Sequence, residues 1–241
     1  MRIDFHSHIL PDMDDGSKDA DESLELLRML CLSNVECVAL TSHFYCKDED
    51  IASFVKRREK ALEALKARLV KAADFNVPNL VVGAEVYFYP SLADDPDIDK
   101  LCIENTDYLL LELPFESFRD TFYRSFANFS NRCSKKIILA HLERYLKFGN
   151  TPDDLKRLFE YGDFVIQLNC TSLARARFKE KRIYSEMLSS PAIIGTDTHN
   201  TVTRPPMYDK AEKFIVKKCG EDVFERICKN GELILRNKDI R

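Results

Sequence analysis

Residues 108–113 read YLLLEL, a short apolar run that contains one carboxylate, Glu112. A run without polar alternation is typical of a parallel strand that is buried on both faces. An unpaired carboxylate in such a strand is costly or must take up a proton, and a divalent cation beside it removes this cost. The segment therefore predicts a buried parallel strand with a cation near its carboxyl end.

Similar runs recur along the chain and alternate with amphipathic stretches. Further strands are predicted at 2–6, 37–41, 79–85, 136–141, 164–169 and 192–196, and helices at 21–34, 51–75, 118–133, 151–161, 178–189 and 207–219. Seven strands alternating with helices predict an α/β fold, with a barrel of parallel strands as the expected closure. Because no linker or low-complexity tract interrupts the pattern, residues 1–241 are expected to form a single domain.

Composition excludes several classes of protein. Of the 241 residues 45% are hydrophobic, which supplies a sizeable core and excludes intrinsic disorder. The 36 Lys and Arg against 40 Asp and Glu give a net charge of −4, whereas a non-specific nucleic-acid binder is expected to be basic. The N-terminus lacks the apolar segment of a signal peptide, and no run reaches the roughly 20 residues of a membrane helix. We therefore expect a cytoplasmic protein without a membrane span or a nucleic-acid partner.

The histidines of this chain are few and follow one rule of placement. All five lie at or shortly after the carboxyl end of a predicted strand, and three acidic residues obey the same rule. These ends converge on one rim of a parallel barrel, so the pattern predicts a multinuclear metal centre there. Imidazoles and carboxylates without a thiolate suit Mn²⁺, Fe²⁺ or Zn²⁺, and this many candidates predicts two or three ions. The candidates are His6, His8, His43, Glu85, Glu112, His141, Asp197 and His199.

A thiol-based mechanism is not expected. Cysteine phosphatases place an arginine six positions after the nucleophile, and none of the eight cysteines has this neighbour. Cys170 comes nearest, with Arg175 one position too close and Arg177 one too far. A thiolate nucleophile is therefore disfavoured.

The motifs, taken in order, resemble those of the polymerase-and-histidinol-phosphatase (PHP) superfamily. More narrowly, they resemble its CpsB-type branch, the metal-dependent protein-tyrosine phosphatases of bacterial capsule and exopolysaccharide loci. The motifs are HSHILPDMDDG at 6–16, SH at 42–43, GAE at 83–85, LLLELPF at 109–115, AHLERY at 140–145, GTDTHN at 195–200 and RPP at 204–206. The chain departs from the family at Ser42, where proline is common, and in FYCKDED at 44–50, which borders the substrate entrance in the family.

This resemblance implies a distorted seven-stranded TIM-like barrel, the PHP fold, with three metal ions. It assigns His6, His8, Glu85 and Asp197 to the first ion, Glu85, Glu112 and His141 to the second, and Asp15, His43 and His199 to the third. Asp14 is the alternative for the role of Asp15. Arg144 and Arg204 match the phosphate-contacting arginines of the family; the alternative for Arg144 is a salt bridge with Glu143.

The implied activity is metal-dependent hydrolysis of a phosphomonoester, with Mn²⁺ as the expected ion. The expected substrate is a phosphotyrosine protein, namely a tyrosine autokinase that regulates capsular or exopolysaccharide synthesis. A small-molecule phosphatase of the histidinol-phosphatase type is the alternative. A 3′–5′ exonuclease is disfavoured by the acidic composition, and an inactive scaffold is disfavoured because every ligand position is filled.

Overall fold

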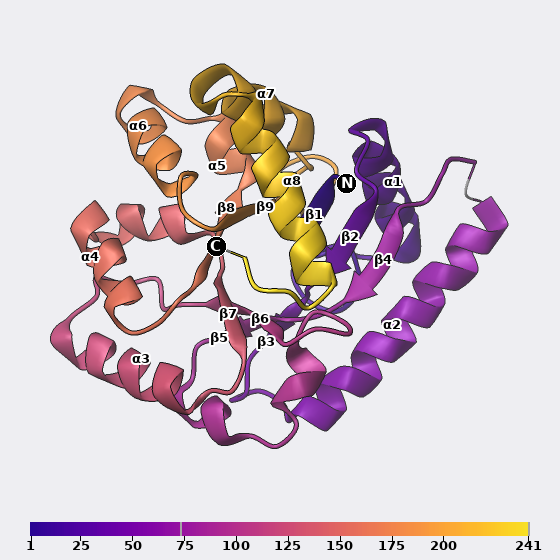
Figure 1. Ribbon diagram of the computed structural model, residues 1–241. Helices are drawn as coiled ribbons and strands as arrows, with labels where there is room; N and C mark the ends of the chain where they lie inside the picture. Colours follow the sequence, from indigo (N-terminus) through magenta and orange to yellow (C-terminus); the bar gives the residue numbers. More distant parts are fainter. Residues whose placement is uncertain (73, 241) are drawn as a thin grey trace.

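The computed structural model describes residues 1–72 and 74–240, with the strands in the centre and most helices around them (Figure 1). The strands are β1 (Ile3–Ser7), β2 (Cys37–Leu40), β3 (His43–Phe44), β4 (Asn79–Val82), β5 (Glu85–Tyr87), β6 (Tyr108–Glu112), β7 (Lys136–Leu139), β8 (Val165–Asn169) and β9 (Ala192–Gly195). The α-helices are α1 (Ala20–Leu32), α2 (Ile51–Ala72), α3 (Asp120–Arg132), α4 (Pro152–Arg157), α5 (Cys170–Ala174), α6 (Phe178–Met187), α7 (Tyr208–Cys219) and α8 (Glu221–Leu235). Short 3₁₀ helices span Pro90–Asp94, Ile98–Leu101, Leu142–Phe148 and Leu158–Glu160.

The strands form two sheets in which every pair is parallel. One sheet has the order β1-β2-β4, and the other has the order β3-β5-β6-β7-β8-β9. Two-residue breaks at 41–42 and 83–84 separate β2 from β3 and β4 from β5, so two chain segments run from one sheet into the other. The expected parallel α/β architecture is confirmed, but the described residues form no single closed sheet.

The first and last strands nevertheless lie side by side. The amide of Asp197 donates to the carbonyl of His6 at 2.7 Å, and the amide of His8 donates to the carbonyl of Thr198 at 2.9 Å. Gly195 permits this approach, because a Cβ at that position would lie 2.4 Å from the Cβ of His6. The contact brings the HxH motif next to the DxH motif, although nearly the whole chain separates them.

The predicted strands are all present, with boundaries that shift by a few residues. The predicted strand at 79–85 is divided into β4 and β5, and the two-residue strand β3 was not predicted. The helix predicted at 51–75 corresponds to α2 up to Ala72, residue 73 lies outside the described residues, and residues 74–75 are not helical. The helix predicted at 151–161 ends at Arg157 and continues as a 3₁₀ turn.

Helix α8 is the main element that the sequence analysis missed. Its middle carries Asn230 and Gly231, which weaken the apolar periodicity that identifies a helix. Both residues are buried, and the Asn230 amide donates to the carbonyl of Ala192 at 2.9 Å. The helix therefore lies against β9 and β1. In the described part of the chain, no helix has the length and apolar character that a bilayer crossing requires.

Candidate metal centre

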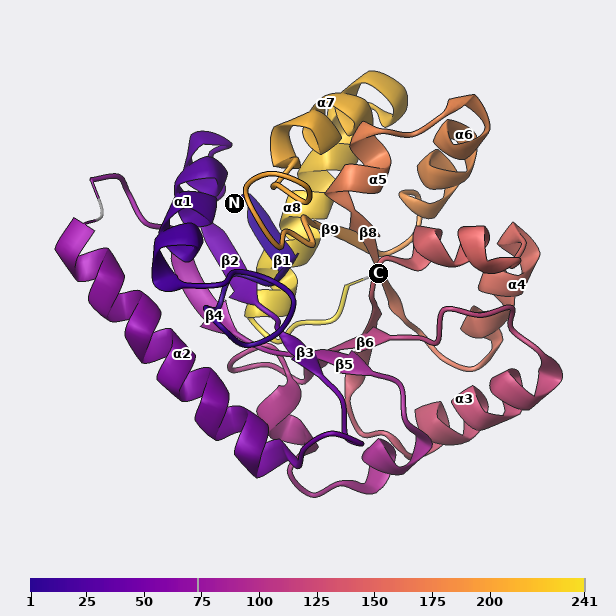
Figure 2. The same cartoon turned by 180° about the vertical axis from the view of Figure 1, so that it is seen from behind.

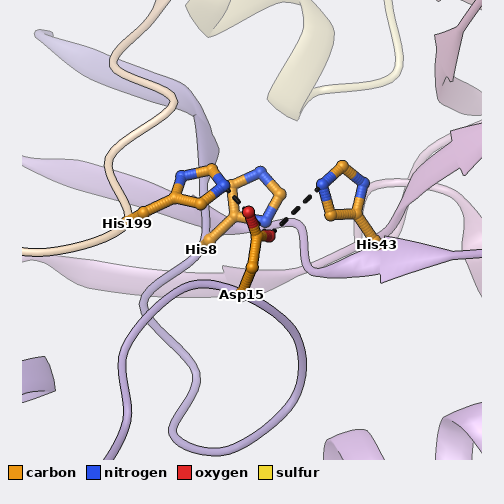
Figure 3. Close-up of side chains that lie close together, drawn as sticks. All are labelled: His8, Asp15, His43 and His199. Carbon is orange, nitrogen blue, oxygen red and sulfur yellow. Dashed lines mark ion pairs between the residues drawn. The ribbon is translucent and has the colours of Figure 1, made fainter. Parts of the chain in front are cut away.

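All nine expected metal ligands lie in one cluster. His6 lies within β1, Glu112 ends β6, and His43 and Glu85 begin β3 and β5 directly after the two breaks between the sheets, whereas the other five lie in the segments that follow β1, β7 and β9. Three groups of their donor atoms each lie within 4.8 Å of one another: His8, Asp15, His43 and His199; His6, His8 and Glu85; and His43, Glu85 and Glu112. Figure 3 shows the first group, in which the carboxylate of Asp15 points between the imidazoles of His43 and His199. The loops that carry Asp15 and His199 also approach each other in the view from behind (Figure 2).

The two remaining residues join the cluster through ion pairs. His141 Nε2 lies 2.8 Å from Glu85 Oε1 and 3.4 Å from Glu112 Oε1. Asp197 Oδ1 lies 3.4 Å from His8 Nε2. The grouping differs in part from the one that the resemblance implies, because His8 also lies with the Asp15 group and His43 also lies beside Glu85.

Three of the imidazoles are held in the same way. In each, Nδ1 donates to an oxygen of the protein: His6 to Gln167 Oε1 (3.0 Å), His8 to Asp14 Oδ2 (2.8 Å) and His199 to the Asp197 carbonyl (3.0 Å). In the neutral form of each imidazole, these contacts select the tautomer in which Nε2 carries a lone pair. Histidine ligands of metals in proteins are typically oriented by such a contact.

The Nε2 atoms then face carboxylate oxygens. His6 and His8 place Nε2 at 3.0 and 3.1 Å from Glu85 Oε2, and His199 places it at 3.2 Å from Asp15 Oδ1. Lone pairs that face one another at these distances repel unless a positive charge lies between them. Glu85 Oε2 and His199 Nε2 are also buried without a hydrogen-bond partner among the described residues. This donor set suits divalent cations.

The electrostatics of the cluster favour ionised carboxylates. Burial would raise the pKa of Glu85, but the surrounding imidazoles, His6 foremost, hold it well below its usual range. The pKa of Asp197 is likewise far below its usual range, because His6, His8 and Arg204 outweigh its burial. Burial and the neighbouring His8 lower the pKa of His199 to about 3, so this imidazole is neutral. Anionic carboxylates and a neutral imidazole are the forms that bind metal ions.

The two acidic residues of the DDG motif have different positions. The Asp14 side chain is only 7% exposed and accepts from His8 Nδ1 and, at 2.8 Å, from the amide of His43. The Asp15 side chain is 66% exposed and faces His43 and His199. A Cβ on Gly16 would lie 2.2 Å from the carbonyl of His8, so this loop can pass under the HxH motif only with glycine there. Asp14 therefore lies behind His8, and Asp15 lies on the side of the donor atoms.

Two members of the cluster have left-handed backbone conformations. His141 follows β7 with φ of 32°, and Asp197 follows β9 with φ of 51°. Such conformations are uncommon outside glycine and cost about 1–3 kcal/mol each. They persist where surrounding structure holds them, which is frequent at functional sites.

Both expected phosphate-contacting arginines point at Asp197. Its Oδ2 accepts from Arg144 Nη1 at 2.9 Å, from Arg204 Nη2 at 2.7 Å and from Asn169 Nδ2 at 2.7 Å. The salt bridge considered for Arg144 and Glu143 does not form, since Arg144 pairs with Asp197 instead. Oδ1 faces imidazoles while Oδ2 faces the arginines, so Asp197 separates the predicted metal ligands from the two guanidiniums.

The sequence analysis did not identify Gln167. Its Oε1 accepts from His6 Nδ1 and, at 2.8 Å, from the amide of His141, so it orients two members of the cluster. The signal was one amide inside the otherwise apolar run FVIQL at 164–168. Cys170 is fully buried, and burial raises the pKa of its thiol well above the usual range, as expected for a cysteine without a nucleophilic role.

Known proteins resemble this chain in sequence and in fold. Residues 2–236 match the family described as "Capsular polysaccharide synthesis, CpsB/CapC". The tyrosine-protein phosphatase YwqE of Bacillus subtilis (strain 168) is 29% identical over 99% of this chain and 93% of its own length. The tyrosine-protein phosphatase CpsB of Streptococcus agalactiae serotype III (strain NEM316) is 26% identical over 98% of both chains. Crystal structures have been described of YwqE from Bacillus subtilis and CpsB from Streptococcus pneumoniae as unique metal-dependent tyrosine phosphatases. A chain from these structures superposes on this protein with a TM-score of 0.82 and is 26% identical in sequence. The match covers 99% of this chain and 96% of that one.

Proposed function

Because this chain belongs to the capsular polysaccharide synthesis CpsB/CapC family, we propose that it is a metal-dependent protein-tyrosine phosphatase. The observation that carries the proposal is the set of Nε2 atoms of His6, His8 and His199 that face carboxylates at 3.0–3.2 Å. Relatives named tyrosine-protein phosphatases match over almost the whole chain, which supports the same reaction here. The substrate in this proposal is a phosphotyrosine protein, in particular a tyrosine kinase of a capsule locus.

The proposed ligands are the nine clustered residues, and they would hold two or three divalent ions. The mixture of imidazoles and carboxylates supports Mn²⁺, with Fe²⁺ or Zn²⁺ as alternatives. When bound, such ions supply a nucleophile at neutral pH and neutralise charge on the phosphoryl oxygens. Glu85 is the proposed bridging ligand, since its two oxygens face different partners: Oε1 faces His141, and Oε2 faces His6, His8 and His43.

Arg144 and Arg204 are the proposed phosphate-binding residues. Their side chains are 30% and 37% exposed, so substrate can reach them. Each donates to Asp197 through one terminal nitrogen, and a guanidinium has five N–H donors in a planar fork. The remaining donors suit the oxygens of a phosphoryl group. Both arginines can therefore orient Asp197 and hold the substrate at the same time.

The scaffold in this proposal is the distorted seven-stranded barrel. Its seven segments are β1, β2 with β3, β4 with β5, β6, β7, β8 and β9. The hydrogen bonds that join β1 and its extension to the segment after β9 support closure. We also propose that residues 1–241 act as one phosphatase domain.

A substrate panel tests the function. Protein loaded with Mn²⁺ is assayed for phosphate release from a phosphotyrosine peptide and from histidinol phosphate, and for nuclease activity on single-stranded DNA. We expect turnover on the peptide, loss of that turnover with a chelator, and its return when Mn²⁺ is added. Preferential hydrolysis of histidinol phosphate would support the small-molecule alternative, and an inactive protein with full metal content would refute the proposal.

A further inference from the structure

Aromatic side chains gather along one side of the candidate metal centre. The described part of the chain has four exposed aromatic residues. Tyr45 and Tyr89 lie in the loops after β3 and β5, Phe148 ends the 3₁₀ helix after β7, and Phe178 lies on α6. Single exposed apolar residues are normal on a protein surface, whereas a contiguous group of them marks an interaction or ligand-binding site. Their concentration beside the centre therefore needs a cause.

The first group of rings begins at a histidine of the cluster. The Tyr45 ring stacks on the imidazole of His43, with centroids 5.2 Å apart and an interplanar angle of 30°. Tyr87, which is half-buried and pairs in register with Glu112, lies 5.7 Å from the Tyr45 ring. Tyr45 belongs to segment 44–50, where the sequence departs from the pattern of the family.

The second group begins at another histidine. The half-buried Phe115 ring stacks on the imidazole of His141, with centroids 5.6 Å apart. The centroid of the exposed Phe148 ring lies 5.0 Å from that of Phe115. The guanidinium carbon of Arg144 lies 5.1 Å from the centroid of the Phe115 ring. An apolar surface thus starts directly beside an arginine that we assign to phosphate and leads outward to an exposed phenylalanine.

The order of the strands connects the two groups. Tyr45 follows β3, Tyr87 ends β5, Phe115 follows β6 and Phe148 ends the 3₁₀ helix after β7, and these four strands are consecutive in the sheet. The arginine that follows β9, Arg204, comes from the other end of that sheet. The aromatic residues therefore follow one side of the rim.

We propose that Tyr45, Tyr87, Phe115 and Phe148 form an aryl-recognition surface that binds the ring of the phosphorylated residue and makes the site selective for aryl over alkyl phosphomonoesters. The inference rests on the proposed phosphatase function. In an aryl phosphate a single oxygen separates phosphorus from the ring, so a surface that recognises the ring must begin at the phosphate site. The neighbourhood of Phe115, His141 and Arg144 meets this requirement, and packing against aromatic rings favours an aryl group through area and ring geometry.

The test compares ring-removing variants with ring-keeping controls. Phe148→Leu and Tyr45→Leu remove a ring face but keep an apolar side chain, whereas Tyr45→Phe keeps the ring. Phe178→Ala removes an exposed ring outside the aromatic surface. Each variant is loaded with Mn²⁺, its metal content is measured, and kcat/KM is determined for phenyl phosphate and for propyl phosphate.

We expect each Leu variant to lower the aryl-to-alkyl ratio of kcat/KM by about two- to tenfold, the range of one aromatic pair. Tyr45→Phe and Phe178→Ala are expected to keep the wild-type ratio. A binding measurement supplies a second readout: calorimetry should show that Phe148→Leu weakens phenylphosphonate more than propylphosphonate.

The outcomes separate the two proposals. If the wild type hydrolyses phosphomonoesters but the Leu variants keep its ratio and its phosphonate preference, the aryl surface is refuted and the phosphatase function stands. If the wild type hydrolyses neither ester, the function fails, and the phosphonate titrations still decide whether the surface selects aryl groups. Equal losses on both esters with lowered metal content would assign Tyr45 to the support of His43 and refute a recognition role for it.

Discussion

If Arg144 and Arg204 bind phosphate as proposed, replacing either with alanine should separate metal binding from phosphate binding. Each guanidinium donates one hydrogen bond to Asp197 Oδ2, and a third donor, Asn169, remains when either arginine is removed. Because both arginine side chains are about one-third exposed, their ion pairs should stabilise the fold by no more than about 1 kcal/mol. We therefore expect near-normal melting temperatures and full metal content in both single variants.

The effect on turnover should be much larger. Removing one preorganised donor to a developing charge typically costs about 2.7–4 kcal/mol, or about 100- to 1000-fold in kcat. Lysine at either position should restore only part of the rate, since it supplies a point charge in place of a planar fork. The double alanine variant leaves Asp197 with a single donor, and here we expect metal content to fall as well.

Asn169→Ser is the matched control. It removes a donor to the same Asp197 oxygen, but a serine can still cap α5 as Asn169 does through its side-chain oxygen. A hydrogen bond from a neutral amide to a carboxylate is worth about 1.5 kcal/mol at the low end of bonds to charged groups, so we expect roughly a tenfold loss. The assays are metal analysis, thermal melting and steady-state kinetics on a phosphotyrosine peptide. A loss in Asn169→Ser as large as in the arginine variants would refute the phosphate-binding role, as would wild-type rates in both alanine variants.

Three further outcomes follow from the same geometry. Glu85→Gln should lose metal and activity together, because one neutral oxygen cannot hold two cations; undiminished turnover would contradict a shared ligand. Cys170→Ser and thiol alkylation should leave most of the activity, since the thiol is buried and its raised pKa keeps it protonated; a full loss with metal still bound would revive a cysteine mechanism. Asp15→Asn should lower metal content directly. Asp14→Asn should weaken metal binding by about 10- to 100-fold, because the hydrogen bond that orients His8 is lost. Equal metal affinity in the wild type and in Asp14→Asn would exclude a role for Asp14 in orienting His8.

Most of the strand pattern was predictable because it depends on local composition. Apolar runs such as KIILAH at 136–141 predict a parallel strand whatever its neighbours are. The split of the run at 79–85 into β4 and β5 was not predictable, because it depends on how two sheets share one segment. Whether the strands close into one continuous sheet, as expected of a barrel, depends on pairing between strands that are far apart in the sequence. The described residues form two sheets instead.

The clustering of the ligand candidates was also predictable, because each lies at or shortly after the end of an apolar run in the sequence and parallel strands place these ends together. Their partners were not. Gln167 is one amide in a strand, and only the fold shows that it holds His6 and His141. The donation of Arg144 and Arg204 to Asp197 was unforeseen for the same reason, since these residues come from different loops.

The charge of the site explains why ions and substrate should bind together. When the imidazoles are neutral, as metal binding requires, five carboxylates and two guanidiniums leave the site with a charge of about −3. The carboxylates are those of Asp14, Asp15, Glu85, Glu112 and Asp197, and the guanidiniums are those of Arg144 and Arg204. A phosphomonoester dianion would be repelled from such a rim despite the two arginines. Two bound divalent ions would make the net charge of the site slightly positive, and three would make it clearly positive. Bound cations are often the largest local charges in a site. In the proposed function, the ions that would supply the nucleophile would therefore also be needed for Arg144 and Arg204 to bind the phosphoryl group. Metal removal should weaken substrate binding as well as slow hydrolysis.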